Sequence, residues 1–140
     1  ALLERYFARY LQDVELQLNQ TDGTPRERLL NHFRAAVELF VQQGHIVGCL
    51  GVKVSAEVCD LSEPMRDALQ QGAGKITALY ARTLIAAEQQ ESLSLPQPPA
   101  QMAELLSLLW LGASLQSKIS REAQPLRLAL STIEQWLESH

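Results

Sequence analysis

Apolar residues recur at three- and four-residue steps along most of this chain, which is the spacing of amphipathic helices. The pattern predicts a first helix over about residues 2–18 and a second over about 25–43. The second helix carries boundary signals at both ends, with Thr24 as an N-cap and Gly44 as a C-terminal stop. Each helix presents one apolar stripe, so both are expected to pack on a common core.

The C-terminal half continues the helical pattern. A long helix is expected from an N-cap at Ser62 to about Glu91, and the proline-rich linker SLSLPQPP separates it from a helix over about 99–119. A last helix follows, and its apolar seam runs over 126–137. Two glycines at 72 and 74 lie inside the long helix, where each costs ~1 kcal/mol relative to alanine. They predict close helix packing or a bend.

The stretch between Gly44 and Ser62 is the most ambiguous part of the chain. Its segment HIVGCLGVKV is rich in β-formers, but a lone strand in a helical chain has no strand to pair with. We therefore expect a loop to about Gly48 and a short helix over about 50–59. The prediction for residues 1–140 is one all-α domain of about six helices.

The segment LLSLLWLGASL, residues 105–115, is apolar nearly all round its predicted helix. Such a helix must be covered on both sides. A chain of 140 residues cannot easily surround it, so we expect a homodimer in which the last two helices of each copy form an intersubunit four-helix bundle. The alternative is a monomer with this helix at its centre.

Composition narrows the class of protein. With 12 basic and 16 acidic residues the net charge is −4, which argues against this chain alone gripping a phosphate backbone. No apolar run approaches the ~20 residues of a membrane span, so no membrane association is expected. Two cysteines favour a reducing, cytoplasmic setting. The chain begins without Met inside an amphipathic helix, which indicates a piece of a longer protein.

Motifs for catalysis are missing from the sequence. The three histidines, His32, His45 and His140, have no partners at metal-ligand spacing, and neither a phosphate-binding glycine loop nor a nucleophile elbow occurs. We therefore expect no enzymatic activity, no metal and no cofactor.

Cys49 lies where the short helix over about 50–59 is expected to begin. A thiol at a helix N-terminus meets the positive end of the helix dipole, which favours the reactive thiolate. The other interpretation is a small buried hydrophobic residue. Cys59 is ten residues further on, about 15 Å along a helix axis, so a disulfide between the two cysteines is not expected.

Lys118 follows the almost wholly apolar turns of the helix over 99–119. The ordinary interpretation is that Lys118 and Arg121 neutralise the helix C-terminus and extend into water. The functional interpretation is an amine directed into the bundle, where loss of water would make it nucleophilic. The sequence alone leaves both open.

Aromatic residues at helical spacing leave a second functional class open, a pocket for a noncovalent apolar inducer. Its candidate lining residues are Tyr6, Phe33, Phe40, Tyr80 and Trp110. The alternative for these side chains is that they form the core. A third class is a helical dimerisation or adaptor module that binds no ligand.

Two long motifs, GCLGVKVSAEVCDLSEPMRDAL and LWLGASLQSKISREAQPL, carry a resemblance that covers essentially the whole chain. The chain resembles the C-terminal regulatory domain of the TetR family of transcriptional repressors, and the motifs resemble an electrophile-responsive member of it. The resemblance implies a homodimer whose helix-turn-helix module, absent from this chain, binds operator DNA.

The resemblance also implies roles for two residues. Cys49 matches the cysteine that senses electrophiles and reactive chlorine, and Lys118 matches its partner lysine. Modification of Cys49, or a sulfur–nitrogen bond to Lys118, would release DNA from the full-length repressor. Cys59 also matches a family cysteine but has no role that the residues suggest. Further family cysteines have no counterpart here, which puts intersubunit disulfides in doubt.

Overall fold

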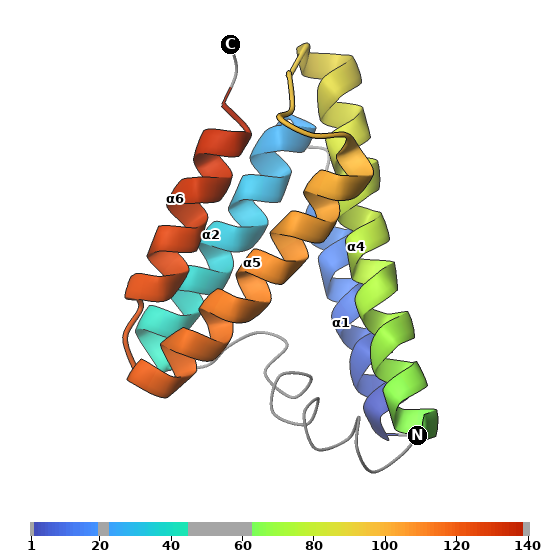
Figure 1. The fold of residues 1–140 in the computed structure, drawn as a ribbon, viewed down its shortest axis with the longest axis vertical. Helices are drawn as coiled ribbons and strands as arrows, with labels where there is room; N and C mark the ends of the chain where they lie inside the picture. The colour runs from blue at the N-terminus through green and yellow to red at the C-terminus, as the bar shows by residue number, and fades with distance from the viewer. Residues whose placement is uncertain (1, 20–22, 45–62, 139–140) are drawn as a thin grey trace.

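The computed structural model describes residues 2–19, 23–44 and 63–138 as an all-helical bundle (Figure 1). Its helices are α1 (Leu2–Leu18), α2 (Pro25–Gln43), α4 (Glu63–Glu91), α5 (Pro99–Ser120) and α6 (Gln124–Trp136). These bounds confirm the helices expected over the described part of the chain. The expected short helix over about 50–59, the N-cap at Ser62 and both cysteines lie outside the described residues.

The ends of α2 show why the chain folds into a helix there. The Oγ1 of Thr24 accepts a hydrogen bond from the Glu27 backbone N–H at 3.2 Å. Gly44 adopts a left-handed conformation with φ of 65°, and its N–H donates to the Phe40 carbonyl oxygen at 2.8 Å. Both predicted boundary signals are therefore confirmed.

The helices pack around one large hydrophobic cluster, with a second, smaller cluster between α2, α5 and α6. α2 packs against α4 and α6, α5 packs against α4 and α6, and α1 packs against α2 and α4. In Figure 1, α5 crosses in front of α2, and the first residues of α1 and α4 lie at the same end of the bundle. This shared end places the start of α1 beside the part of α4 that follows residues 45–62.

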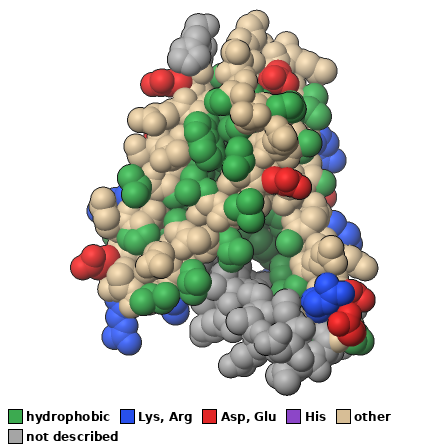
Figure 2. Space-filling view, in the orientation of Figure 1, with side chains coloured by type: hydrophobic (Ala, Val, Ile, Leu, Met, Phe, Trp, Pro, Cys, Tyr) green, Lys and Arg blue, Asp and Glu red, His purple; other side chains and the backbone are tan. Residues whose placement is uncertain are grey.

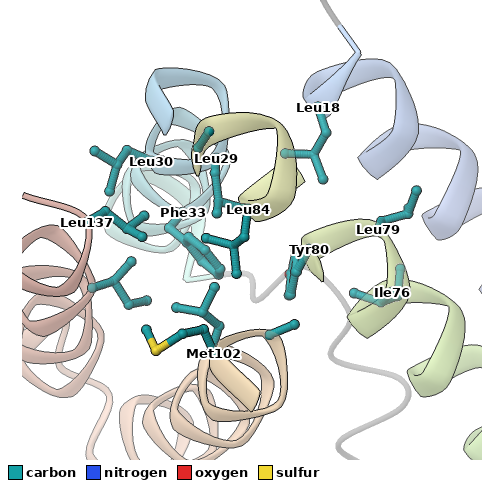
Figure 3. Close-up of a cluster of buried hydrophobic side chains, with 14 of the residues drawn as sticks. Leu18, Leu29, Leu30, Phe33, Ile76, Leu79, Tyr80, Leu84, Met102 and Leu137 are labelled. Carbon is teal, nitrogen blue, oxygen red and sulfur yellow. The ribbon is translucent and has the colours of Figure 1, made fainter. Parts of the chain in front are cut away.

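Phe33 of α2 is fully buried at the centre of the core. Its ring centroid lies 4.7 Å from that of Trp110 in α5 and 5.5 Å from that of Tyr80 in α4. Figure 3 shows Phe33 pointing toward Leu84 of α4 and Met102 of α5, both of which are buried. The aromatic cluster thus joins the three helices that surround it.

Gly72 marks the close helix packing that the sequence predicts, while Gly74 does not. A Cβ added to Gly72 would lie 2.6 Å from the Phe7 ring of α1, whereas nothing lies within 4 Å of a Cβ added to Gly74. The absence of a side chain at Gly72 therefore allows α1 to approach α4.

Gly72→Ala is expected to lower the free energy of unfolding by about 1–3 kcal/mol relative to Gly74→Ala. In Gly74→Ala the added methyl meets no atom, and alanine favours the helix by ~1 kcal/mol, so that variant should be more stable than wild type. Urea unfolding of the three proteins measures the difference. Equal stabilisation by both substitutions would contradict a close α1–α4 contact at Gly72.

One side of α5 is apolar and exposed in a single copy. The exposed residues of this apolar ridge are Leu105, Leu108, Leu111, Leu115 and Ile119. Figure 2 shows hydrophobic side chains gathered over α5 and along its borders with neighbouring helices. The described bundle therefore does not surround this helix, contrary to the monomeric alternative. Among the described helices, none is long and apolar enough to cross a membrane.

Candidate functional site

A basic hollow of about 670 Å³ lies where α2 ends and where α5 turns into α6. Its cationic lining residues are Lys118, Arg121 and Arg127. Phe40 and Gly44 are part of its wall from α2. The hollow therefore combines three positive charges with an apolar side, at the point where the chain leaves α2 toward Cys49.

The turn between α5 and α6 that shapes the basic hollow is held by Ser117. Its buried Oγ accepts a hydrogen bond from the Leu126 N–H at 3.2 Å, and its carbonyl oxygen accepts one from the Arg121 N–H at 2.8 Å. Arg121 takes a left-handed conformation with φ of 60°. This non-glycine residue thus reverses the chain at the end of α5, so that Lys118 before the turn and Arg127 after it both line the hollow.

Lys118 is exposed, so its amine is not directed into the core as the functional interpretation supposed. The ion pairs within the described ranges lie elsewhere, joining Arg34 to Glu134 and Arg66 to two acidic neighbours. The charges of the basic hollow thus have no acidic side chain paired with them in the described structure. Such a surface attracts anions and stabilises a thiolate close to it.

Of the predicted sensor pair, Cys49 and Lys118, the structure describes only Lys118. Cys49 lies outside the described residues, as does Cys59, so the pairing of Cys49 with Lys118 stays a prediction. Gly44 lines the basic hollow together with Lys118, and Cys49 follows Gly44 by five residues.

An apolar cavity of about 500 Å³ lies among α1, α4 and α5. Tyr80 and Trp110 line it, as the inducer hypothesis expected. Phe33 packs behind those two rings instead of lining the cavity, and Phe40 lines the basic hollow. The side chain of Tyr6 is outside the described structure.

Several lining residues of the apolar cavity escaped the sequence analysis. Phe7 and Tyr10 come from α1, and Thr77 of α4 faces Ser107 of α5 with their hydroxyl oxygens 2.9 Å apart. The sequence feature that could have indicated this hydroxyl pair is a small polar residue in each helix, because Ser107 interrupts an apolar run. The cavity therefore offers an apolar body with a hydroxyl pair at one side.

A buried polar chain supports the wall of the apolar cavity. His32 Nδ1 lies 2.6 Å from Gln17 Oε1, and His32 Nε2 lies 3.0 Å from the hydroxyl oxygen of Tyr80. Because Oε1 only accepts, Nδ1 donates to it, and Nε2 accepts from the Tyr80 hydroxyl. The chain joins α1, α2 and α4 through three side chains.

Burial lowers the pKa of His32 to about 4, so the ring is neutral at physiological pH. Burial, and then the neighbouring Tyr10 hydroxyl, raise the pKa of Tyr80 well above its usual range. Both groups are thus kept in the forms that the hydrogen bond between them requires. Across residues 2–19, 23–44 and 63–138, no group of three or more potential ligands could hold a metal ion.

The amino-acid sequence of this chain is similar to one protein family and to known transcriptional repressors. The profile of a family described as tetracyclin repressor-like, C-terminal domain, matches residues 25–133. Over 134 residues the chain is 43% identical to the HTH-type transcriptional repressor NemR of Escherichia coli K12, covering 96% of this chain and 67% of that protein. It is 26% identical to the repressor DhaR of a Mycobacterium species, over 94% of this chain and 65% of that protein.

The fold of this chain is also similar to solved structures of transcriptional regulators. The reduced form of E. coli NemR matches with a TM-score of 0.92 and 40% identity, over 99% of this chain and 72% of that one. A transcriptional regulator of the TetR/AcrR family matches with a TM-score of 0.83 and 31% identity, over 98% of this chain and 72% of that one.

Proposed function

Because this chain belongs to the tetracyclin repressor-like C-terminal domain family, we propose that it is the regulatory part of a transcriptional repressor that senses electrophiles or reactive chlorine through Cys49. The relatives NemR and DhaR are transcriptional repressors, and the matched segment makes up 67% of the length of NemR. The repressor would bind operator DNA through a helix-turn-helix module outside these residues.

The basic hollow carries this proposal. Five residues span at most about 18 Å, so the Cα of Cys49 lies within that distance of the Cα of Gly44, which lines the hollow with Lys118. Lys118, Arg121 and Arg127 would favour the thiolate of a cysteine brought close to them. A reactive-chlorine sensor needs such a thiolate, and a structure of NemR described as its reduced form points to redox chemistry in that relative.

Two modifications of Cys49 follow from this chemistry. The thiolate adds to the double bond of an N-alkylmaleimide, and a proton from water completes the adduct. Hypochlorous acid instead transfers chlorine to the sulfur and releases hydroxide. Once the Lys118 ammonium has given a proton to the hydroxide released in that step, its nitrogen displaces chloride from the sulfur and loses a second proton, which leaves a sulfur–nitrogen bond comparable to a sulfenamide.

The fold offers a route from Cys49 to the DNA-binding module. Residues 45–62 join the end of α2 to the start of α4, the first residue of which is Glu63. A bond from Cys49 to Lys118 would pull on this connection, and a bulky maleimide adduct would crowd it, so either modification would displace the start of α4. α4 holds α1 through the close contact of Gly72 with Phe7. Displacing α4 would therefore move the start of α1, and with it the module that precedes α1 in the relatives. A coupling free energy of about 1–3 kcal/mol is typical of such switches.

In this proposal the full-length repressor acts as a homodimer. The apolar ridge of α5 is continued by Leu128 of α6, which is 63% exposed, so two-fold pairing of α5 and α6 would bury both apolar surfaces. Such pairing gives the intersubunit four-helix bundle expected from the sequence.

A second candidate function is supported by the apolar cavity. Its volume of about 500 Å³ suits a small apolar inducer, and its aromatic walls with few polar groups are typical of ligand pockets. A noncovalent inducer would release DNA without modifying Cys49, which separates it from the sensor proposal. The cavity also argues against a dimerisation module that binds no ligand.

N-ethylmaleimide below one equivalent is expected to label Cys49 at least about tenfold faster than Cys59, since a thiolate reacts and a thiol does not. Peptide mass spectrometry after short exposures measures both sites in the same sample. Labelling in urea, where both thiols are accessible, serves as the control. Preferential labelling of Cys59 would contradict the sensor role of Cys49 and favour the noncovalent inducer.

A further inference from the structure

We propose that a second copy of this chain completes the apolar cavity, so that ligand binding in the cavity and dimerisation strengthen each other. The inference rests on the homodimer proposed above and adds a shared ligand site to it. It makes the interface between subunits part of the regulation, rather than only a scaffold.

The cavity and the apolar ridge share residues of α5. Leu108 and Leu111 line the cavity, yet they are 66% and 51% exposed. They therefore form the rim where the cavity meets solvent. Leu108 also lines a second groove of about 370 Å³ between α5 and α6, together with Leu128. One leucine thus borders both the cavity and the surface proposed to receive the partner.

Helix geometry places the rim beside the ridge. At about 100° per residue, Leu108, Leu115 and Ile119 project within about 40° of one another and mark the centre of the ridge. Leu111 projects about 60° from Leu108 on the cavity side. A partner helix docked on the ridge at ~8–10 Å would therefore reach over Leu111 and the cavity opening.

The lining of the cavity indicates what it would hold. Thr77 and Ser107 supply hydroxyl groups, and Glu104 at the rim is the acidic residue among the described lining residues. None of the described lining residues is basic. This composition favours a neutral apolar molecule with one hydrogen-bonding group and disfavours anions.

If the partner subunit covers the cavity opening, ligand binding and dimerisation become coupled equilibria. In a single copy a bound molecule stays partly exposed through the rim, whereas in the dimer the partner removes that exposure. Burial of more apolar surface makes binding tighter in the dimer. By thermodynamic linkage, each bound ligand must tighten the dimer by the same factor.

The test uses the neutral fluorescent probe N-phenyl-1-naphthylamine with the 140-residue chain. Ala73→Phe fills the cavity from α4, so the part of the fluorescence that this variant loses reports the cavity alone. Leu128→Arg and Ile119→Arg place a charge on the proposed interface without touching the cavity lining. Leu16→Arg is the matched control, because Leu16 is 67% exposed on α1 and borders none of these surfaces.

The expected result is that both interface variants sediment as monomers and bind the probe in the cavity about 5- to 150-fold more weakly, while Leu16→Arg matches wild type. Because each dimer holds two cavities, saturating probe should lower the dimer dissociation constant of wild type by the square of that factor. Monomeric variants with wild-type probe affinity would overturn the inference and leave the dimer standing. A monomeric wild type would remove the proposed dimer and the inference together, and a wild type without cavity fluorescence would overturn the inference alone.

Discussion

Cys49→Ser in the full-length repressor is expected to slow DNA release by N-ethylmaleimide or hypochlorite at least about 100-fold. Serine has nearly the shape of cysteine, but its hydroxyl stays protonated and does not add to a maleimide at neutral pH. Operator affinity without the reagent should stay unchanged, since the substitution removes reactivity and little volume. Fluorescence anisotropy of labelled operator DNA, followed after reagent is added, measures the rate of release.

Three further variants show which residue and which reaction cause the effect. Cys59→Ser should release DNA like wild type, which assigns the effect to Cys49 rather than to loss of any thiol. Lys118→Ala should respond normally to N-ethylmaleimide, because that adduct needs no amine, but less to hypochlorite. Lys75→Ala is the control for Lys118, because Lys75 is exposed on α4 away from the basic hollow. Normal release by Cys49→Ser would show that the sensor assignment is wrong.

The helices were predictable because their signals are local. The Oγ1 of Thr24 caps α2 by accepting from a backbone N–H three residues further along the chain, and Gly44 ends the helix by its own backbone conformation. Pro99 begins α5 as expected. Such features depend on neighbours in sequence, so they can be inferred without knowing how the helices pack. Membership of the TetR family was likewise predictable from two long motifs and is confirmed by the family profile and the relatives.

The cavity was predictable only in part, because periodicity gives the buried face of each helix and not which faces meet. Tyr80 and Trp110 line the cavity, but Phe33 fills the space behind them, although all three lie on buried faces. The pairing of Thr77 with Ser107 joins residues 30 positions apart. It depends on the crossing of α4 and α5, which no local pattern contains.

The partners of His32 were also beyond sequence reasoning, which considered that residue only as a metal ligand. Its neighbour Phe33 indicated the core, but Gln17 and Tyr80 come from two other helices. A histidine on an apolar helix face therefore signals a buried hydrogen-bonded ring as readily as a metal site. The consequence of that burial is a dependence of stability on pH.

Lowering the pH from about 6.5 to about 4 is expected to destabilise the fold by about 3 kcal/mol through His32 alone. The pKa of this ring falls from 6.5 in the unfolded chain to about 4 in the fold, because burial opposes its charge. Between those values the unfolded chain binds a proton that the folded chain does not. The contribution of His32 is therefore fully present above pH 6.5, declines as pH falls, and stops changing below about 4.

His32→Gln isolates this effect, because an amide can still donate to Gln17 and accept from Tyr80 but does not titrate in this range. Its free energy of unfolding is expected to lie below that of wild type at pH 7, since the ring is lost from a packed site, and to approach it at pH 4. Urea unfolding of both proteins between pH 4 and pH 7.5 gives the difference, in which the shared carboxylates cancel. A constant difference across this range would mean that folding does not change the pKa of His32, and that the buried chain from Gln17 to Tyr80 does not hold the ring neutral.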